Sequence, residues 1–390
     1  MTNTIDAPNR QVRFFELDSL RGLAALIVVL HHLRFLWEGE TQPTSVICRV
    51  FLDLVTPFGS AAVILFFVLS GFVLSLPAVN GRPQTYPTFI TRRIFRIYVP
   101  YLAALAISVA GAFWLHGGVF GSGWIGNSWS ERVNWHLVGQ HILFLGSYDT
   151  DQLDPTIWSL VYEMRISLFF PLLCGFVLRF KSGWSFAIAA GLTIVAITLE
   201  KITFEIAPGL ADTFQYAGLF VLGIFLARER SRLGAWFHHR RRFAKVLIGL
   251  AFLLLFLFAG APLIRSTGHF LHSRICISQC ITAFGAGGLM IVSMNSASSK
   301  RVLHWPPIHF LGQISYSLYL LHYVVLLYCV HLLYGKVSLW GILCLIFVLS
   351  IFVSWLSYRF IEVPSMNLGR KLSNAFPSPA GARRAAIPRP

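Results

Sequence analysis

The sequence predicts an all-α protein, a polytopic bundle of about ten transmembrane helices with both termini in the cytoplasm. Hydrophobic residues make up 56% of the 390-residue chain, and the mean hydropathy is +0.66. Only 12% of the residues are charged, about half the usual share in a soluble protein. Apolar runs of about 20 residues, the length that crosses a bilayer, recur along the whole chain. These observations exclude a disordered chain, a coiled coil and an ordinary cytosolic enzyme.

The predicted spans follow the apolar runs in order. They lie at 20–38, 57–78, 97–116, 156–178, 184–204, 211–227, 244–262, 274–294, 314–334 and 339–358. A shorter run at 135–147 is interrupted by His136, Gln140 and His141, so we expect a re-entrant or interfacial segment there. The first run lacks a following small-residue cleavage site, so we expect no signal peptide to be removed.

The charge distribution sets the predicted orientation. The net charge is +16, and with the N-terminus inside, most of the 32 Lys and Arg residues fall in cytoplasmic segments. If 135–147 crossed the membrane, the basic block at 228–245 would face outward, against the positive-inside rule. The positive charge therefore indicates membrane topology, with a lipid bilayer as partner and no nucleic acid.

Three regions follow from this arrangement. Residues 1–19 form a short cytoplasmic segment, and 20–362 form the membrane domain. Residues 363–390 are rich in Pro, Ser, Ala and Arg, and we expect a basic, disordered cytoplasmic tail.

The first and fourth runs contain ionisable side chains. Such side chains are energetically costly in lipid, so their presence there requires a structural or functional explanation. Arg21 and His32 are eleven residues apart, which places them on one helix face about 16 Å apart along the axis. Glu163 lies about 10 Å into the fourth run, at a depth similar to that of His32. A carboxylate beside an imidazole orients it and raises its basicity. A capping arginine, a packing histidine and a structural pair of Glu163 with Arg165 or His32 explain the same pattern.

Further polar residues offer weaker signals. Tyr319 and His322 lie in the ninth run, where a lone histidine is more often a packing residue than a ligand. Arg92, Arg93 and Arg96 form a dense cluster at the cytoplasmic surface. Such a cluster suits phosphate recognition, but topology and anionic lipid head groups also account for it. Small residues in FFVLSGF (66–72) allow close helix packing.

Several familiar catalytic motifs are absent. The chain has no phosphate-binding GxxxxGK[ST] loop, no HExxH zinc motif and no GxSxG nucleophile motif. We therefore expect no nucleotide-powered pump and no metal cofactor.

Six motifs in order resemble the acyltransferase-3 family of integral membrane O-acyltransferases. They are LDSLRGLAALIVVLHH, FFVLSGF, RRIFRIYVPYL, TIWSLVYEMRISLFFPLL, SYSLYLLH and YRFIEVP, and together they cover about 14–370. The resemblance implies ten spans and transfer of an acyl group, often acetyl, from cytosolic acyl-coenzyme A to a hydroxyl. It also implies that His32 is the catalytic base and that arginines lie on the donor side. Met164 follows Glu163 where the family usually has a second carboxylate. Many members carry an added extracytoplasmic hydrolase-like domain, which we do not expect in this chain.

The resemblance leads to a specific expectation for each candidate. Arg93 and Arg96, with Arg92 and Arg21, would bind the phosphates of acetyl-coenzyme A or another acyl-coenzyme A. His32 would take the proton of the acceptor hydroxyl, while Glu163 would hold His32 or bind the acceptor. Other contacts to the acceptor or the oxyanion are expected from Ser159, Arg165, Tyr319 and His322.

Three kinds of substrate or activity remain open at this point. The acceptor would be a glycan or glycolipid, or alternatively a macrolide-type small molecule. A proton-coupled transporter or flippase also uses intramembrane His and Glu residues, but it does not need an arginine cluster at a donor site. The expected location is the inner membrane of a bacterium.

Overall fold

The computed structural model describes residues 14–38, 58–117, 124–144, 148–203, 209–258 and 271–376, and within them it contains helices and no strands. The prediction of an all-α fold is therefore confirmed. Seven helical segments in this part of the chain are long and apolar enough to cross a membrane. They are α3 (Gly59–Val79), α4 to α5 (Tyr86–Leu115), the segment Pro155–Arg179 that contains α8 (Trp158–Arg179), α10 (Leu210–His238), α13 (Leu271–Asn295), α15 (Pro306–Leu333) and α16 to α17 (Leu339–Ser373).

The other three predicted spans are also helical. They correspond to α1 (Phe15–Glu38), α9 (Trp184–Thr203) and α11 (Arg242–Phe258). The first of these begins with Glu16, Asp18 and Arg21, which lower its apolar character. A helix therefore stands at each predicted run, while the number of spans and the side on which the termini lie remain predictions.

Within the polar run at 135–147, residues Trp135–Leu143 form the short helix α7, and residues 145–147 lie outside the described part of the chain. The side chain of Asn134 caps its N-terminus by accepting hydrogen bonds from the backbone N–H groups of His136 and Leu137. Phe144 ends the helix in the left-handed conformation. At 9 residues, or about 14 Å, this helix is too short to span a bilayer, as predicted.

Two π-helical segments occur where a Val-Pro pair follows, at η2 (Ile94–Tyr98) and η4 (Tyr358–Glu362). Proline has no N–H, so Pro100 and Pro364 leave carbonyls without their α-helical donors. Side chains from other helices satisfy carbonyls in η2. The Tyr316 hydroxyl donates to Ile97 O at 2.8 Å, and the Ser365 hydroxyl donates to Phe95 O.

The start of the predicted disordered tail is helical. Residues Val363–Ser373 form α17, which packs along α4 (Tyr86–Arg93). The guanidinium of Arg92 donates to Ser373 Oγ at 2.8 Å, and this contact ties the two helices together. The expectation of disorder from residue 363 is therefore wrong as far as Ser373, because proline near a helix start and packing against α4 both favour a helix. Residues 377–390 lie outside the described part of the chain.

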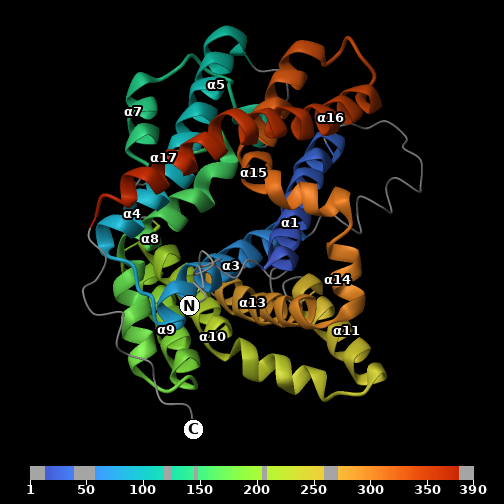
Figure 1. Cartoon of the computed structure of the whole chain (residues 1–390). Coiled ribbons are helices and arrows are strands. Elements are labelled where there is room, and N and C mark those ends of the chain that lie inside the picture. Colours follow the sequence, from blue (N-terminus) through green and yellow to red (C-terminus); the bar gives the residue numbers. More distant parts are fainter. Residues whose placement is uncertain are drawn as a thin grey trace, which may run out of the picture.

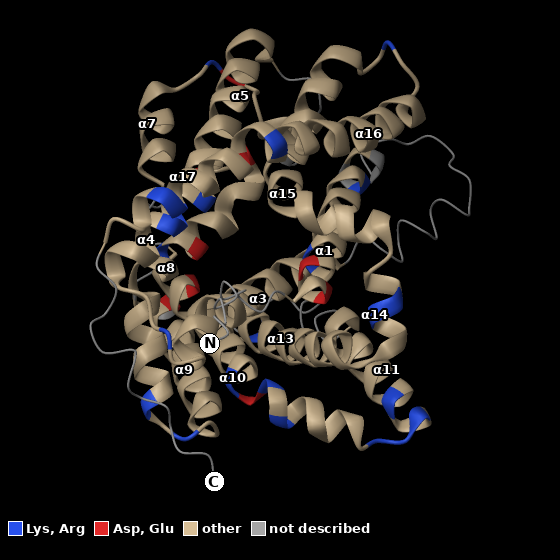
Figure 2. Cartoon of the chain, in the orientation of Figure 1, with Lys and Arg blue, Asp and Glu red and all other residues tan. Residues whose placement is uncertain are grey.

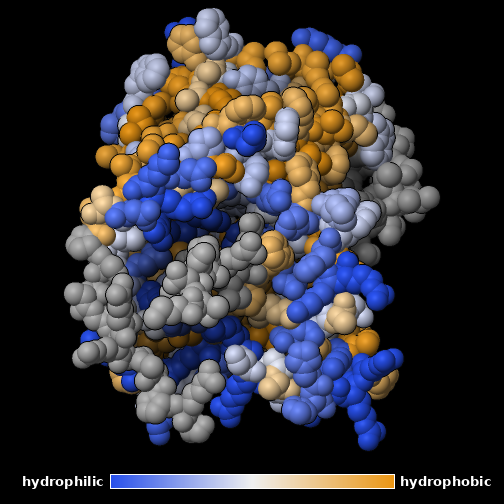
Figure 3. Space-filling model, viewed as in Figure 1, coloured by the Kyte–Doolittle hydropathy of each residue, from blue (hydrophilic) through white to orange (hydrophobic). Residues whose placement is uncertain are grey.

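Helices α1 and α15 cross in the middle of the bundle and pack extensively on each other (Figure 1). A Cβ added to Gly22 would lie 2.3 Å from Gly312 N, so only glycine permits this crossing. A similar close contact joins α3 to α10, where Gly71 faces the backbone of Phe220. This contact agrees with the close packing predicted for FFVLSGF. Hydrophobic side chains gather over the upper half of the face in Figure 3, and hydrophilic ones gather below, where the face is hollowed.

Candidate active site

Two buried histidines meet at the contact between α1 and α15. His32 Nδ1 lies 3.1 Å from His322 Nε2, and the ring centroids are 5.0 Å apart. His32 follows Gly22 by ten residues, and His322 follows Gly312 by ten residues. Because the glycines touch and the histidines touch at the same spacing, the two helices run parallel. The glycine crossing thus sets the register that brings the imidazoles together.

The hydrogen bonds of this pair assign its tautomers. His322 Nδ1 lies 3.0 Å from Leu318 O, so this nitrogen carries a proton and donates it to the carbonyl. His322 Nε2 is then an acceptor, and His32 Nδ1–H donates to it. The same His32 N–H also lies 2.9 Å from Val28 O. The lone pair of His32 is therefore at Nε2, which is the arrangement needed in a general base.

Tyrosine and serine side chains extend the site toward α8. The hydroxyls of Ser159 and Tyr319 are 2.7 Å apart, and Tyr319 donates its own proton to Thr156 O at 2.8 Å. The ring of Tyr319 lies 6.1 Å from that of His322. On the other side, Tyr323 meets His32 edge-on at 5.3 Å. The structure thus brings Ser159, Tyr319 and His322 to the neighbourhood of His32.

Glu163 has a different partner from the one that its depth suggested. Its Oε1 accepts from Arg93 Nη2 at 2.7 Å and from Ser70 Oγ at 2.9 Å. Arg93 is 5% exposed, and a buried guanidinium requires a counter-charge and hydrogen bonds. Ser167 Oγ supplies a further acceptor for Arg93, at 3.0 Å from Nε. His32 is hydrogen-bonded to His322, and the hydrogen bonds described for Glu163 go to Arg93 and Ser70.

A charged cluster surrounds this ion pair, and we call Arg21, Arg93, Arg96, Glu163 and Glu362 the arginine cluster. Arg21 lies within electrostatic reach of Arg96, Glu163 and Glu362, and it is 3.7 Å from Asp18. Glu362 accepts from Ser317 Oγ at 2.8 Å and was not recognised from the sequence, although YRFIEVP contains it. Figure 2 shows charged residues on α1, α4 and α8 around one central region. With Asp18 included, three arginines face three carboxylates, so the formal charges of this region balance.

Two predicted residues have other contacts. Arg92 binds α17, as described above. Arg165 donates to Gly209 O at 3.1 Å and to Thr213 Oγ1 at 3.3 Å, and its guanidinium lies 5.3 Å from the Tyr162 ring centroid. These contacts direct Arg165 toward the start of α10. In the described residues, no group of three His, Cys, Asp or Glu side chains is arranged to hold a metal ion.

The site combines a buried pair of imidazoles with a cluster of arginines and carboxylates. Arg21 and His32 are on α1, about 16 Å apart along its axis. Tyr316 and Ser317 beside the arginine cluster, and His322 beside the base, are all on α15. One cation of the cluster, Arg21, is therefore on the same helix as His32, while Arg93 and Arg96 come from α4 and η2.

Comparisons with known proteins agree with this chemistry. A family model described as an acyltransferase domain matches residues 14–359. The acyltransferase MdmB of Streptomyces mycarofaciens is 26% identical over 354 residues, which cover 85% of this chain and 84% of MdmB. The peptidoglycan O-acetyltransferase OatA of Listeria monocytogenes is 20% identical over 365 residues, which cover 89% of this chain. The O-acetyltransferase OatA of Staphylococcus aureus is 23% identical over 409 residues, which cover 94% of this chain.

The matched region spans 55% of the Listeria protein and 59% of the Staphylococcus protein. Among solved structures, none matches this chain. The family model nevertheless covers most of the sequence, and the apolar helices make this an integral membrane protein. The chain belongs to the acyltransferase-3 family.

Proposed function

We propose that the protein transfers an acyl group, in the first instance acetyl, from acyl-coenzyme A to a hydroxyl group. The observation that carries this proposal is the buried His32–His322 pair, positioned by the same two helices that border the arginine cluster. Membership of an acyltransferase family supports the reaction class. The names of the OatA relatives support acetyl as the group transferred.

The donor would bind at the arginine cluster. Arg21 and Arg96 are the cations to which we assign its pyrophosphate, because Glu163 holds Arg93 at 2.7 Å, whereas the contact of Arg21 with Asp18 is longer, at 3.7 Å. Glu163 then keeps Arg93 in place between α4 and α8, and Glu362 lies within electrostatic reach of Arg96 and Arg21. The narrow pantetheine arm would extend along α1 and α15 and bring the thioester to His32.

At the other end, His32 Nε2 would remove the proton of the acceptor hydroxyl. The hydroxyl oxygen attacks the thioester carbonyl carbon, a C–O bond forms, and the C–S bond breaks. The departing thiolate takes the proton from the imidazolium, so the histidine returns to its starting state. His322 holds the tautomer with the lone pair at Nε2, and it stabilises the charged imidazolium of His32 through its own Nε2 lone pair.

The first acceptor to test is a glycan hydroxyl. Two of the relatives are O-acetyltransferases named OatA, and the Listeria protein acts on peptidoglycan by its name. Ser159 and Tyr319 are the hydroxyl groups that we assign to the acceptor side, since they lie beside the histidine pair. The same relatives lead us to propose a bacterial inner membrane as the location.

The test is acetyl-coenzyme A turnover by purified protein in lipid nanodiscs, with a panel of glycan fragments as acceptors. Release of free thiol and a mass increase of the acceptor by one acetyl group are expected together. A transporter or flippase would leave the thioester intact. His32→Gln is expected to abolish transfer, while His31→Gln, a change at the adjacent residue, retains it. Equal transfer by both variants would remove His32 as the base.

A further inference from the structure

We propose that residues 124–134 and 148–154, here called the outer lid, close the acceptor side of the histidine pair, with Trp129 as the latch. We further infer that the polar residues around the small hollow beside Trp129 line the entry site for a carbohydrate acceptor, which forms when the outer lid opens. This inference rests on the proposed acyltransferase function and extends it to the route of the acceptor.

Trp129 is held at the centre of the outer lid by many contacts. It is 1% exposed, and its indole N–H lies 3.2 Å from both Ser108 Oγ and Leu153 O. Its backbone N–H donates to Gln152 O at 3.1 Å, so the tryptophan joins the two lid segments. Its ring packs edge-on against Tyr328 of α15 at 5.0 Å. A bulky side chain buried this completely in a loop closes the end of the bundle.

The backbone of Trp129 is strained, and the adjoining helix α5 (Val99–Leu115) is shaped to receive its ring. Its φ of 56° lies in the left-handed region, which a large aromatic residue rarely adopts. A Cβ added to Gly111 on α5 would lie 2.1 Å from the Trp129 ring, so glycine leaves the space that the indole occupies. Strain that surrounding contacts maintain is typical of segments that move in function.

The outer lid is connected to the base by two contacts. Ser128 Oγ, next to the latch, lies 3.5 Å from the hydroxyl of Tyr323. The ring of Tyr323 in turn meets His32 at 5.3 Å. A displacement of Trp129 would therefore reach the histidine pair through Ser128 and Tyr323. The closed position excludes water from the base, which protects the thioester from hydrolysis.

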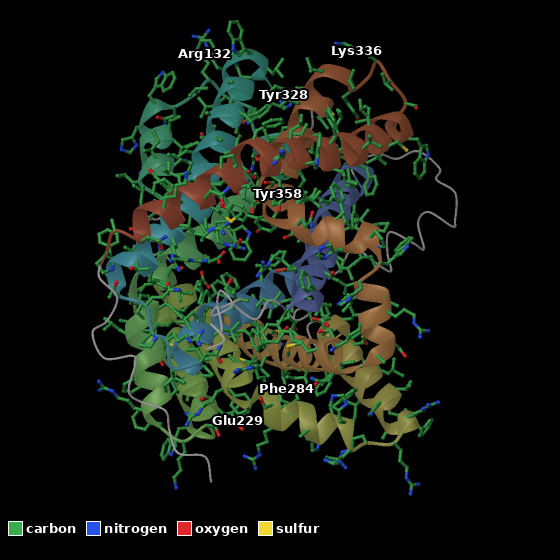
Figure 4. The ribbon with its side chains drawn as sticks, in the orientation of Figure 1. Arg132, Glu229, Phe284, Tyr328, Lys336 and Tyr358 are labelled. Atoms are coloured by element: carbon green, nitrogen blue, oxygen red, sulfur yellow. The ribbon has the colours of Figure 1, made fainter. Side chains whose placement is uncertain are left out.

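The hollow beside Trp129 has room for about one water molecule while the outer lid is closed, and its lining is polar. Trp129 forms part of it, and the polar residues around the ring offer amide, hydroxyl, carboxylate and guanidinium groups. These residues are Asn127, Ser130, Glu131, Arg132, Asn134 and Gln152. Arg132 and Tyr328 lie toward the same end of the molecule, and Glu229 lies at the opposite end (Figure 4). The basic block at 228–245 is predicted to face the cytoplasm, so the hollow faces the outer side.

The decisive experiment measures hydrolysis of acetyl-coenzyme A without acceptor, by release of acetate and free thiol. Trp129→Ala removes the latch, and Gly111→Ala displaces it without altering the tryptophan. Both are expected to raise hydrolysis by about tenfold over wild type, because water gains access to the thioester. Trp114→Ala, at a site 78% exposed on the same helix α5, is the matched control and is expected to leave hydrolysis unchanged.

A second measurement tests the role of the hollow in acceptor entry. It is independent of whether the latch variants fold. Arg132→Ala is expected to raise KM for the glycan acceptor by about tenfold, with KM for acetyl-coenzyme A unchanged. Wild-type hydrolysis in both folded latch variants would overturn the lid, and an unchanged acceptor KM in Arg132→Ala would overturn the entry site. Failure of the proposed function has a different signature, which is absence of thiol release by the wild-type protein with every acceptor.

Discussion

Replacement of Gly22 by alanine tests how the two helices position the base. A Cβ at Gly22 would lie 2.3 Å from Gly312 N, whereas ordinary van der Waals contact begins at 3.4 Å. The nearest atoms belong to the backbone of Leu311 and Gly312, so α1 and α15 must separate by about 1 Å. His32 Nδ1 and His322 Nε2, now 3.1 Å apart, would then exceed the 3.5 Å limit of a hydrogen bond.

The Gly22→Ala substitution is expected to lower kcat. A misplacement of about 1 Å at a catalytic group reduces the rate on the order of 100-fold, which corresponds to about 3 kcal/mol in the activation free energy. KM for acetyl-coenzyme A should rise as well, since Arg21, the neighbouring residue, is one of the cations assigned to the donor. The assay is kcat and KM from thiol release at saturating acceptor.

Gly285→Ala is the matched control for this prediction. A Cβ at Gly285 would lie 2.5 Å from Phe256 N, where α13 crosses α11, so the steric conflict is similar but involves neither histidine helix. Its kcat should remain close to wild type even if its thermal stability falls. A normal kcat for Gly22→Ala, or an equal loss in both variants, would refute the positioning role.

Three further predictions concern stability and the histidine pair. Burial raises the pKa of Asp154, just outside the α8 segment, from 3.8 to about 7. Between these two pH values, the folded state therefore binds more protons than the unfolded state. The free energy of unfolding should therefore fall by about 1.4 kcal/mol per pH unit as pH rises through this window. The melting temperature of Asp154→Asn should not show the corresponding decrease with pH. Glu163→Gln leaves the Arg93 guanidinium without its counter-charge and should lower the unfolding free energy by about 3 kcal/mol, with partial recovery in the double variant Glu163→Gln/Arg93→Gln. His322→Phe keeps a ring but removes the acceptor for His32, so kcat should fall on the order of 100-fold while KM for the donor stays constant.

The helices were predictable because lipid imposes a simple length rule. Apolar runs of about 20 residues and the polar interruption at 135–147 follow directly from the sequence. The helix α17 was not predicted, since composition suggested a linker and the contact of Arg92 with Ser373 depends on residues far apart in the chain. Helical propensity alone does not predict the packing of α17 against α4.

The site was predictable in part. Periodicity placed Arg21 and His32 on one face of α1, but it says nothing about register against a helix 290 residues away. Equal depth suggested Glu163 as partner for His32, whereas the buried charge of Arg93 takes that carboxylate. The matching ten-residue spacing from Gly22 to His32 and from Gly312 to His322 was present in the sequence, and it is the signal that could have identified the pair.

The most direct test of the account separates donor binding from chemistry in His32→Ala. Calorimetry in nanodiscs measures the Kd for coenzyme A, and rapid-quench single turnover measures acetyl transfer from bound acetyl-coenzyme A to a glycan. If His32 is the base, the Kd is unchanged and the transfer rate is lower by about 10²- to 10⁴-fold, the usual contribution of a general base. Transfer at the wild-type rate in the variant would contradict that role of His32.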